Sequence, residues 1–70
     1  MTDVFPARLQ KLRERRRISR KTLSELCGLN PDAVRRYERG EAEPSASSLV
    51  ALADYFSVST DYLLGRTKYF

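Results

Sequence analysis

Ser19–Gly40 reads SRKTLSELCGLNPDAVRRYERG, and this segment decides the fold. Its first residue carries the hydroxyl of a favourable helix cap, and Leu23, Leu26 and Cys27 then fall at the i, i+3, i+4 spacing of one helical face. Gly28 follows, and glycine readily takes the left-handed conformation that ends a helix. The segment therefore predicts a helix of about two turns, followed by a tight turn.

A second helix is predicted directly after this turn. Asn30 is a favourable N-cap, Pro31 fits a first turn that does not need its N–H, and Asp32 complements the helix dipole. Gly40 then ends the helix. The inward face is marked by Val34, Tyr37 and Glu38, whereas Asp32, Arg35, Arg36 and Arg39 are left for the outer face or its flank.

Three more helices are expected outside this segment. One runs from about Pro6 to Arg16, one is capped by Ser45 and one by Ser59. The positions expected to face the core are Phe5, Leu9, Leu12 and Arg16 in the first, Leu49, Leu52, Ala53 and Phe56 in the second, and Leu63 and Leu64 in the third. The sequence thus predicts an all-α, compact five-helix bundle. It forms a single domain over residues 1–70, with a core of about 5–65 and a tail of 66–70.

From about residue 5 to residue 65 the sequence resembles the Cro and phage-repressor family of helix-turn-helix proteins, also known as the xenobiotic-response-element type. The most specific feature is Glu38-Arg39-Gly40 followed by Pro44-Ser45, because it specifies a helix end, a loop and the next helix together. The other matching positions are Leu9, Leu12, Arg13, Ile18, Ser19, Leu23, Gly28, Leu29, Val34, Tyr37, Leu49, Leu52, Ala53 and Val58–Gly65. The resemblance implies a lambda-repressor-like DNA-binding fold, in which the two helices of Ser19–Gly40 form the helix-turn-helix.

Charge is distributed unevenly along the chain, whose net charge is +4. Residues 1–40 hold eleven Lys and Arg against five Asp and Glu, while residues 41–70 hold two against four. A basic face on helices that would meet a duplex is the electrostatic pattern of nucleic-acid binding. The solvated surface of a soluble domain has the same composition, so charge alone leaves both interpretations open.

The resemblance implies that DNA bases are read by Asn30, Asp32, Ala33, Arg35 and Arg36. Pro31 also lies at a reading position but offers only van der Waals contact. Asp32 can accept a hydrogen bond from a cytosine amino group, or it can serve the helix dipole alone. Arg36 is the principal predicted reader, through a bidentate contact to guanine worth about 1–3 kcal/mol of discrimination. Arg35 on the flank can substitute for it or bind phosphate.

The same resemblance implies phosphate contacts from Arg13, Arg20, Lys21, Arg39 and Ser45. Arg20 stands where the family most often has a glutamine that holds a backbone phosphate, and arginine keeps this role. Arg13 and Glu38 match a partly buried structural ion pair of the family, whose arginine also lies near phosphate. Glu41 and Glu43 weaken the attraction of the following loop for DNA, so contacts there are expected from main-chain N–H groups.

Metal sites, disulfides and catalysis are not expected. Cys27 is the only cysteine and histidine is absent, so an intramolecular disulfide is impossible and a metal site is not expected. Cys27 is interpreted as a core residue, with redox sensing as the alternative. The chain is not expected to be an enzyme or to bind a cofactor or small-molecule ligand. It has no apolar run of membrane-spanning length and no signal peptide, which favours a cytoplasmic bacterial or phage protein, associated with the nucleoid.

The leading hypothesis is a sequence-specific, double-stranded DNA-binding transcriptional regulator. It would be a repressor that binds a pseudo-palindromic operator as a homodimer through the major groove. The alternative is an antitoxin or another protein-interaction module with the same fold, which Pro31 and Asp32 at reading positions motivate. The fifth helix and the tail, Arg66–Phe70, are the expected dimer surface, although Tyr69 and Phe70 could equally contact the chain itself or fray.

Overall fold

Helices make up the regular structure of residues 4–70, the part of the chain that this computed structural model describes. They are α1 (Val4–Arg15), α2 (Arg20–Leu26), α3 (Ala33–Glu38), α4 (Ala46–Phe56) and α5 (Thr60–Leu64). The predicted all-α, five-helix fold is confirmed. The single domain predicted for residues 1–70 stays a prediction, and its first three residues lie outside the described part.

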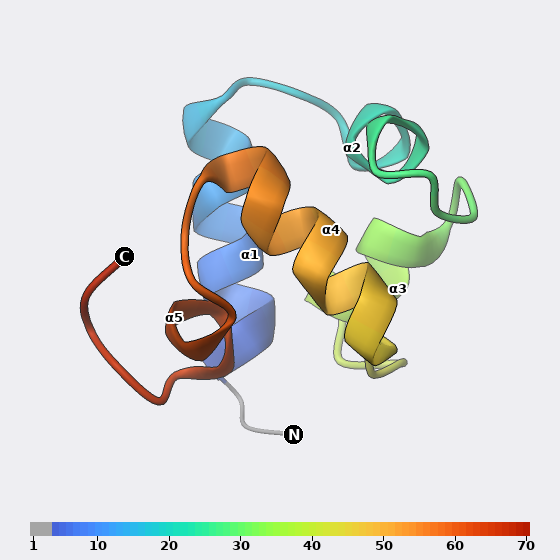
Figure 1. Ribbon diagram of the computed structural model, residues 1–70. Coiled ribbons are helices and arrows are strands. Elements are labelled where there is room, and N and C mark those ends of the chain that lie inside the picture. The colour runs from blue at the N-terminus through green and yellow to red at the C-terminus, as the bar shows by residue number, and fades with distance from the viewer. Residues whose placement is uncertain (1–3) are drawn as a thin grey trace.

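The helices pack around one apolar core (Figure 1). In this view α4 crosses in front of α1, α5 lies against the N-terminal end of α1, and α2 and α3 sit together on the other side. The buried apolar side chains are Phe5, Leu9, Leu12, Leu23, Val34, Tyr37, Leu52, Ala53, Phe56 and Leu63. Burying one large aliphatic side chain contributes about 1.5–3 kcal/mol to the free energy of folding. The apolar residues at helical spacing in the sequence therefore supply the contacts that hold the bundle together.

Serine caps begin three of the helices, as predicted. The side-chain oxygens of Ser19, Ser45 and Ser59 each accept a hydrogen bond from the backbone N–H three residues later, at 3.0, 3.2 and 3.0 Å. Each cap satisfies a backbone N–H that the helix itself leaves without an acceptor. Gly28 and Gly40 follow the ends of α2 and α3 with φ of 71° and 72°, the left-handed conformation expected of them.

The C-terminal end of α1 differs from the prediction at Arg16. The helix ends at Arg15, and Arg16, predicted to face the core, is exposed. Its guanidinium lies over the rings of Tyr55 and Phe56, 5.4 and 5.5 Å from their centroids. Arg16 therefore covers the edge of the core instead of entering it, because its charge stays in water while its stem and guanidinium face contact the aromatic rings.

The start of α3 also differs from the prediction. Asn30 Oδ1 accepts a hydrogen bond from Asp32 N at 2.9 Å, and Asn30 O accepts one from Ala33 N at 2.9 Å. Asn30 does cap the backbone, but the bond from residue 33 to residue 30 closes a tight turn through Pro31 before the regular helix begins. Consequently α3 starts at Ala33, and Asp32 stands at its N-cap without a side-chain capping bond.

The inward face of α2 contains a serine in place of a predicted leucine. Leu23 is fully buried, but Leu26, predicted to share its face, is 61% exposed. Ser24 is fully buried instead. The prediction for Leu26 is wrong because the face of α2 that packs against α3 carries Ser24, whose side chain hydrogen-bonds to the backbone of α3.

Candidate nucleic-acid interface

A buried hydrogen bond joins α2 to the start of α3. Ser24 Oγ accepts a hydrogen bond from Val34 N at 3.0 Å and donates one to Arg20 O at 2.9 Å. The Val34 N–H lies in the first turn of α3, where the helix provides no acceptor. Sequence reasoning does not single out Ser24, because its place beside Leu23 fits a buried or an exposed serine equally well.

Glu38 ties α3 to both preceding helices. Its side chain is 3% exposed and accepts hydrogen bonds from Arg13 Nε at 2.6 Å, Arg13 Nη2 at 3.1 Å and Arg20 Nε at 3.1 Å. Arg13 Nη1 also donates to Ile18 O at 2.9 Å. The hydrogen bond with Glu38 raises the pKa of Arg13, against the lowering effect of burial. This buried ion-pair network of Arg13, Glu38 and Arg20 sets the orientation of α3 relative to α1 and α2.

Arg20 and Lys21, both predicted to hold phosphate, are accessible at the beginning of α2. The Arg20 side chain is 49% exposed, and its two Nη groups make no hydrogen bond within residues 4–70. Lys21 is exposed as well. The Arg13 side chain, by contrast, is only 11% exposed and donates its hydrogen bonds to Glu38 and to the backbone of Ile18. The predicted phosphate-binding residues therefore divide into exposed side chains and one buried one.

A second set of ion pairs lies on the exposed side of α3. Arg35 donates two hydrogen bonds to Asp32, from Nε to Oδ1 at 2.6 Å and from Nη2 to Oδ2 at 2.9 Å. Arg35 Nη2 is 3.8 Å from Glu41 Oε1, and Arg39 Nε is 2.7 Å from Glu41 Oε2. The hydrogen bond from Arg35 lowers the pKa of Asp32, and the same bond raises the pKa of Arg35. This surface ion-pair chain of Asp32, Arg35, Glu41 and Arg39 is electrically neutral as a whole.

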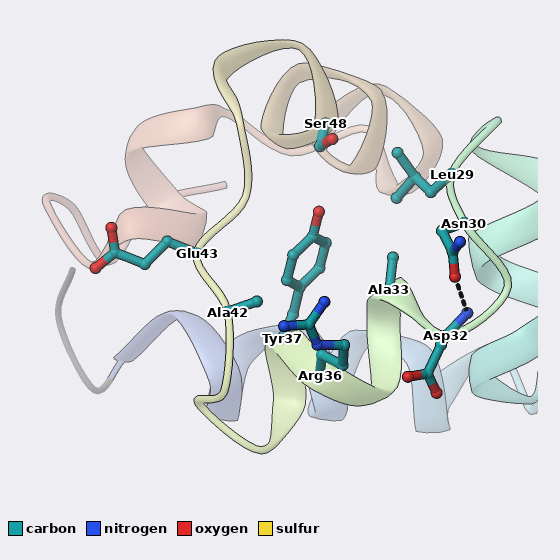
Figure 2. Close-up of a pocket in the computed structure, with 9 residues that line it drawn as sticks. All are labelled: Leu29, Asn30, Asp32, Ala33, Arg36, Tyr37, Ala42, Glu43 and Ser48. Atoms are coloured by element: carbon teal, nitrogen blue, oxygen red, sulfur yellow. Dashed lines mark hydrogen bonds between the residues drawn. The ribbon is translucent and has the colours of Figure 1, made fainter.

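An open groove of about 400 Å³ lies between α3 and the start of α4. Its lining residues are Leu29, Asn30, Asp32, Ala33, Arg36, Tyr37, Ala42, Glu43 and Ser48. Figure 2 shows Tyr37 and Ala33 rising from α3 toward α4, with Arg36 beside Tyr37. The Arg36 guanidinium makes no hydrogen bond or ion pair within residues 4–70. The groove thus brings together Asn30, Asp32, Ala33 and Arg36 of the predicted base readers, while Arg35 lies beside it in the surface ion-pair chain.

The C-terminal tail lies away from α3. In Figure 1 it runs on the α5 side of the molecule, opposite to α2 and α3. Arg8 holds it there by donating hydrogen bonds to Tyr62 O and, at 2.7 Å, to Thr67 O, with its guanidinium 4.2 Å from the centroid of the Tyr62 ring. Tyr69 and Phe70 are 73% and 68% exposed, and the Phe70 ring lies 5.0 Å from that of Tyr62. The tail therefore leaves the exposed face of α3 uncovered.

Ser45 and Cys27, two further residues singled out in the sequence, do not line the groove. Ser45, predicted to contact phosphate, caps α4 and is exposed. Cys27 is a half-buried free thiol, and burial raises its pKa. Within residues 4–70 no group of three or more His, Cys, Asp and Glu side chains is placed to hold a metal ion. In the same part of the chain, no helix has both the length and the apolar character needed to cross a membrane.

The arrangement of α2 and α3 is shared with known proteins. The helix-turn-helix family pattern matches residues 9–63. YonR, a prophage-derived HTH-type transcriptional regulator of Bacillus subtilis (strain 168), is 34% identical over 64 residues, which are 91% of this chain and 59% of YonR. Repressor protein C2 of Salmonella phage P22 is 32% identical over 63 residues, 90% of this chain and 29% of the repressor.

A solved structure extends this similarity to the fold. The crystal structure of the P22 c2 repressor protein in complex with a synthetic operator matches with a TM-score of 0.81 and 31% identity. The match covers 89% of this chain and 94% of that one. The present chain thus spans less than two thirds of YonR and of the whole P22 repressor, and its similarity to the repressor covers nearly all of the structure solved with the operator.

Proposed function

Because this chain belongs to the helix-turn-helix family of phage repressors and related transcriptional regulators, we propose that it regulates transcription by binding duplex DNA at a specific sequence. Family membership confirms the resemblance seen in the sequence, and YonR and the P22 repressor are regulators of transcription rather than enzymes. The operator complex of the P22 repressor supports double-stranded DNA as the partner of this chain.

One observation carries the proposal, namely the state of the arginines on and beside α3. Arg35 is held by Asp32 and Arg39 by Glu41, whereas Arg36 is exposed and unpaired within residues 4–70. An arginine without an internal partner can donate two hydrogen bonds to guanine O6 and N7. We assign base reading first to Arg36, together with Asn30 and Ala33 in the same groove. Asp32 and Arg35 reach bases only when their ion pair opens.

Phosphate binding is assigned to the exposed groups. Arg20 and Lys21 lie at the beginning of α2, Arg39 is 63% exposed, and Ser45 lies at the beginning of α4. Such contacts position a protein on DNA without reading sequence. Arg13 is assigned a structural role, because it is buried against Glu38 and holds α3 in the orientation needed to contact DNA.

We further propose a homodimer that represses transcription by occupying a pseudo-palindromic operator in the cytoplasm. Two copies of α3 related by a two-fold axis would enter successive major grooves about 34 Å apart. The contact is assigned to α5 and the tail, because Tyr69 and Phe70 are exposed aromatic side chains that a second copy would bury.

Selection of bound sites from a random duplex pool, followed by salt titration of the selected duplex, tests the proposal. We expect a symmetric motif and binding that falls steeply with salt. Arg36→Ala should remove the preference at one base-pair position, whereas Arg20→Ala should weaken binding to all sequences alike and reduce the salt slope by about one. Failure to select a motif, or affinity that does not depend on salt, would favour the alternative of an antitoxin or other protein-interaction module.

A further inference from the structure

Tyr37 combines a core ring with a hydroxyl that has no partner. The residue is 8% exposed, and its ring packs edge-to-face on Phe5 with centroids 6.0 Å apart. The hydroxyl makes no hydrogen bond within residues 4–70, and Figure 2 shows it directed into the groove, toward Ser48. Because no buried side-chain nitrogen or oxygen within residues 4–70 lacks a partner, this unpaired hydroxyl is reached by solvent through the groove. A ligand that enters the groove can therefore accept its hydrogen bond in place of water.

The other polar groups near this hydroxyl favour an anionic ligand. Ser48 Oγ accepts a hydrogen bond from Ser45 Oγ at 2.9 Å, so its own proton is left for a ligand. The first turn of α4 lies beside it, and the N-terminal end of a helix carries partial positive charge. The Arg36 guanidinium also lines the groove and adds positive charge to it, while its N–H groups stay assigned to guanine. Hydrogen bonds from such donors are strongest to an ionised acceptor, such as a phosphate oxygen.

Two carboxylates also line the groove, and neither occupies the space in front of Tyr37. Asp32 is neutralised by its two hydrogen bonds from Arg35. Glu43 makes an interaction of its own, and Figure 2 shows its carboxylate directed away from the Tyr37 hydroxyl. The remaining walls come from Leu29, Ala33 and Ala42. Apolar walls fit the C–H surface of a sugar better than they fit a free anion.

We propose that this groove binds one deoxyribose-phosphate unit of the DNA backbone, with Tyr37 Oη donating a hydrogen bond to a phosphate oxygen. The inference rests on the proposed function. A helix that fills a major groove about 12 Å wide has the sugar-phosphate backbone of a DNA strand alongside it. The groove shares Ala33 and Arg36 with the reading face, so both open toward the same duplex. The Tyr37 contact carries no sequence information and fixes how deeply α3 enters the major groove.

Tyr37→Phe tests this assignment, because it removes the hydroxyl and keeps the ring against Phe5. We expect about tenfold weaker binding to the selected duplex and to unrelated duplexes alike, as for the loss of a hydrogen bond to a charged group. The preferred bases and the thermal unfolding midpoint should stay unchanged. Tyr55→Phe is the matched control, since it removes a hydroxyl near the other end of α4, and it should bind as the unaltered protein does.

Duplexes with a single neutral methylphosphonate, placed at each position in turn, locate the phosphate. At one position in each half-site, the substitution should weaken binding of the unaltered protein by a larger factor than binding of Tyr37→Phe, because Ser48 and α4 still face that phosphate in the variant. Equal affinity of Tyr37→Phe and the unaltered protein overturns the inference, and so does a loss confined to one base pair, which would place a base in the groove. If the unaltered protein itself binds no duplex, the proposed function fails before the role of Tyr37 is reached.

Discussion

The two sides of α3 carry ion pairs of opposite kinds. On the inner side, the Glu38 side chain is 3% exposed and joins α3 to α1 and α2. On the outer side, the side chains of the surface ion-pair chain are 40–63% exposed and join α3 only to its own first residues and the next loop. Leaving a buried charge unpaired is costly, whereas exposed pairs are screened by water and salt. One network therefore holds the orientation of α3, and the other sets the charge that α3 presents to a ligand.

The largest effect is expected from Glu38→Gln in the buried ion-pair network. The substitution should lower the free energy of unfolding by about 3 kcal/mol, because the guanidinium of Arg13 stays buried without a counter-charge. Urea unfolding measures this loss. Glu41→Gln in the surface ion-pair chain is the control and should leave the free energy of unfolding nearly unchanged. Equal losses from the two substitutions would remove the distinction between the networks.

A smaller loss is expected from Ser24→Ala, which separates the effect of burial from that of charge. The Val34 N–H would keep its buried place and lose its acceptor, so the free energy of unfolding should fall by about 1–3 kcal/mol. The Val34 amide should also exchange its hydrogen faster. Ser47→Ala, at an exposed position of α4, should alter neither measurement. Unaltered protection of the Val34 amide in Ser24→Ala would mean that Ser24 does not hold α3.

The smallest effect on stability, and a distinct effect on binding, is expected from Asp32→Asn. Arg35 would be released from the surface ion-pair chain, so the salt slope of duplex binding should steepen by about one. Unrelated duplexes should gain more affinity than the selected one, because phosphate attraction carries no sequence information. Asp54→Asn, exposed on α4, changes the net charge equally and serves as the control. Identical binding by the two variants would show that Asp32 does not restrain Arg35.

Features of the fold with local signals could be predicted from the sequence. Ser19, Ser45 and Ser59 each stand before a stripe of apolar residues in the sequence, and each caps the helix that begins there. The error at Leu26 has a tertiary cause. Helical spacing reports which residues share a face, but it does not report that Ser24 bonds to the backbone of α3 and turns Leu26 to the solvent.

For the candidate site, the sequence predicts where the residues lie better than it predicts which side chains they contact. Arg13 and Glu38 lie together as the family resemblance implied. Asp32 and Arg35 are three residues apart, a spacing that permits their ion pair, yet the sequence interpretation assigns Asp32 to a base or to the helix dipole and Arg35 to DNA. The groove and the unpaired Tyr37 hydroxyl depend on how α4 packs beside α3, and no local spacing encodes that packing.

Entry of the exposed face of α3 into the major groove is tested most directly by NMR of isotope-labelled protein during titration with the selected duplex. Backbone amide signals and the arginine Nε–H signals report each position separately. We expect the largest shifts at Asn30, at Asp32–Tyr37 and at Ser48, together with slower exchange of the Arg36 Nε–H. Saturable DNA binding that leaves these signals unchanged, with shifts confined to other helices or the tail, would contradict the placement of α3 in the duplex.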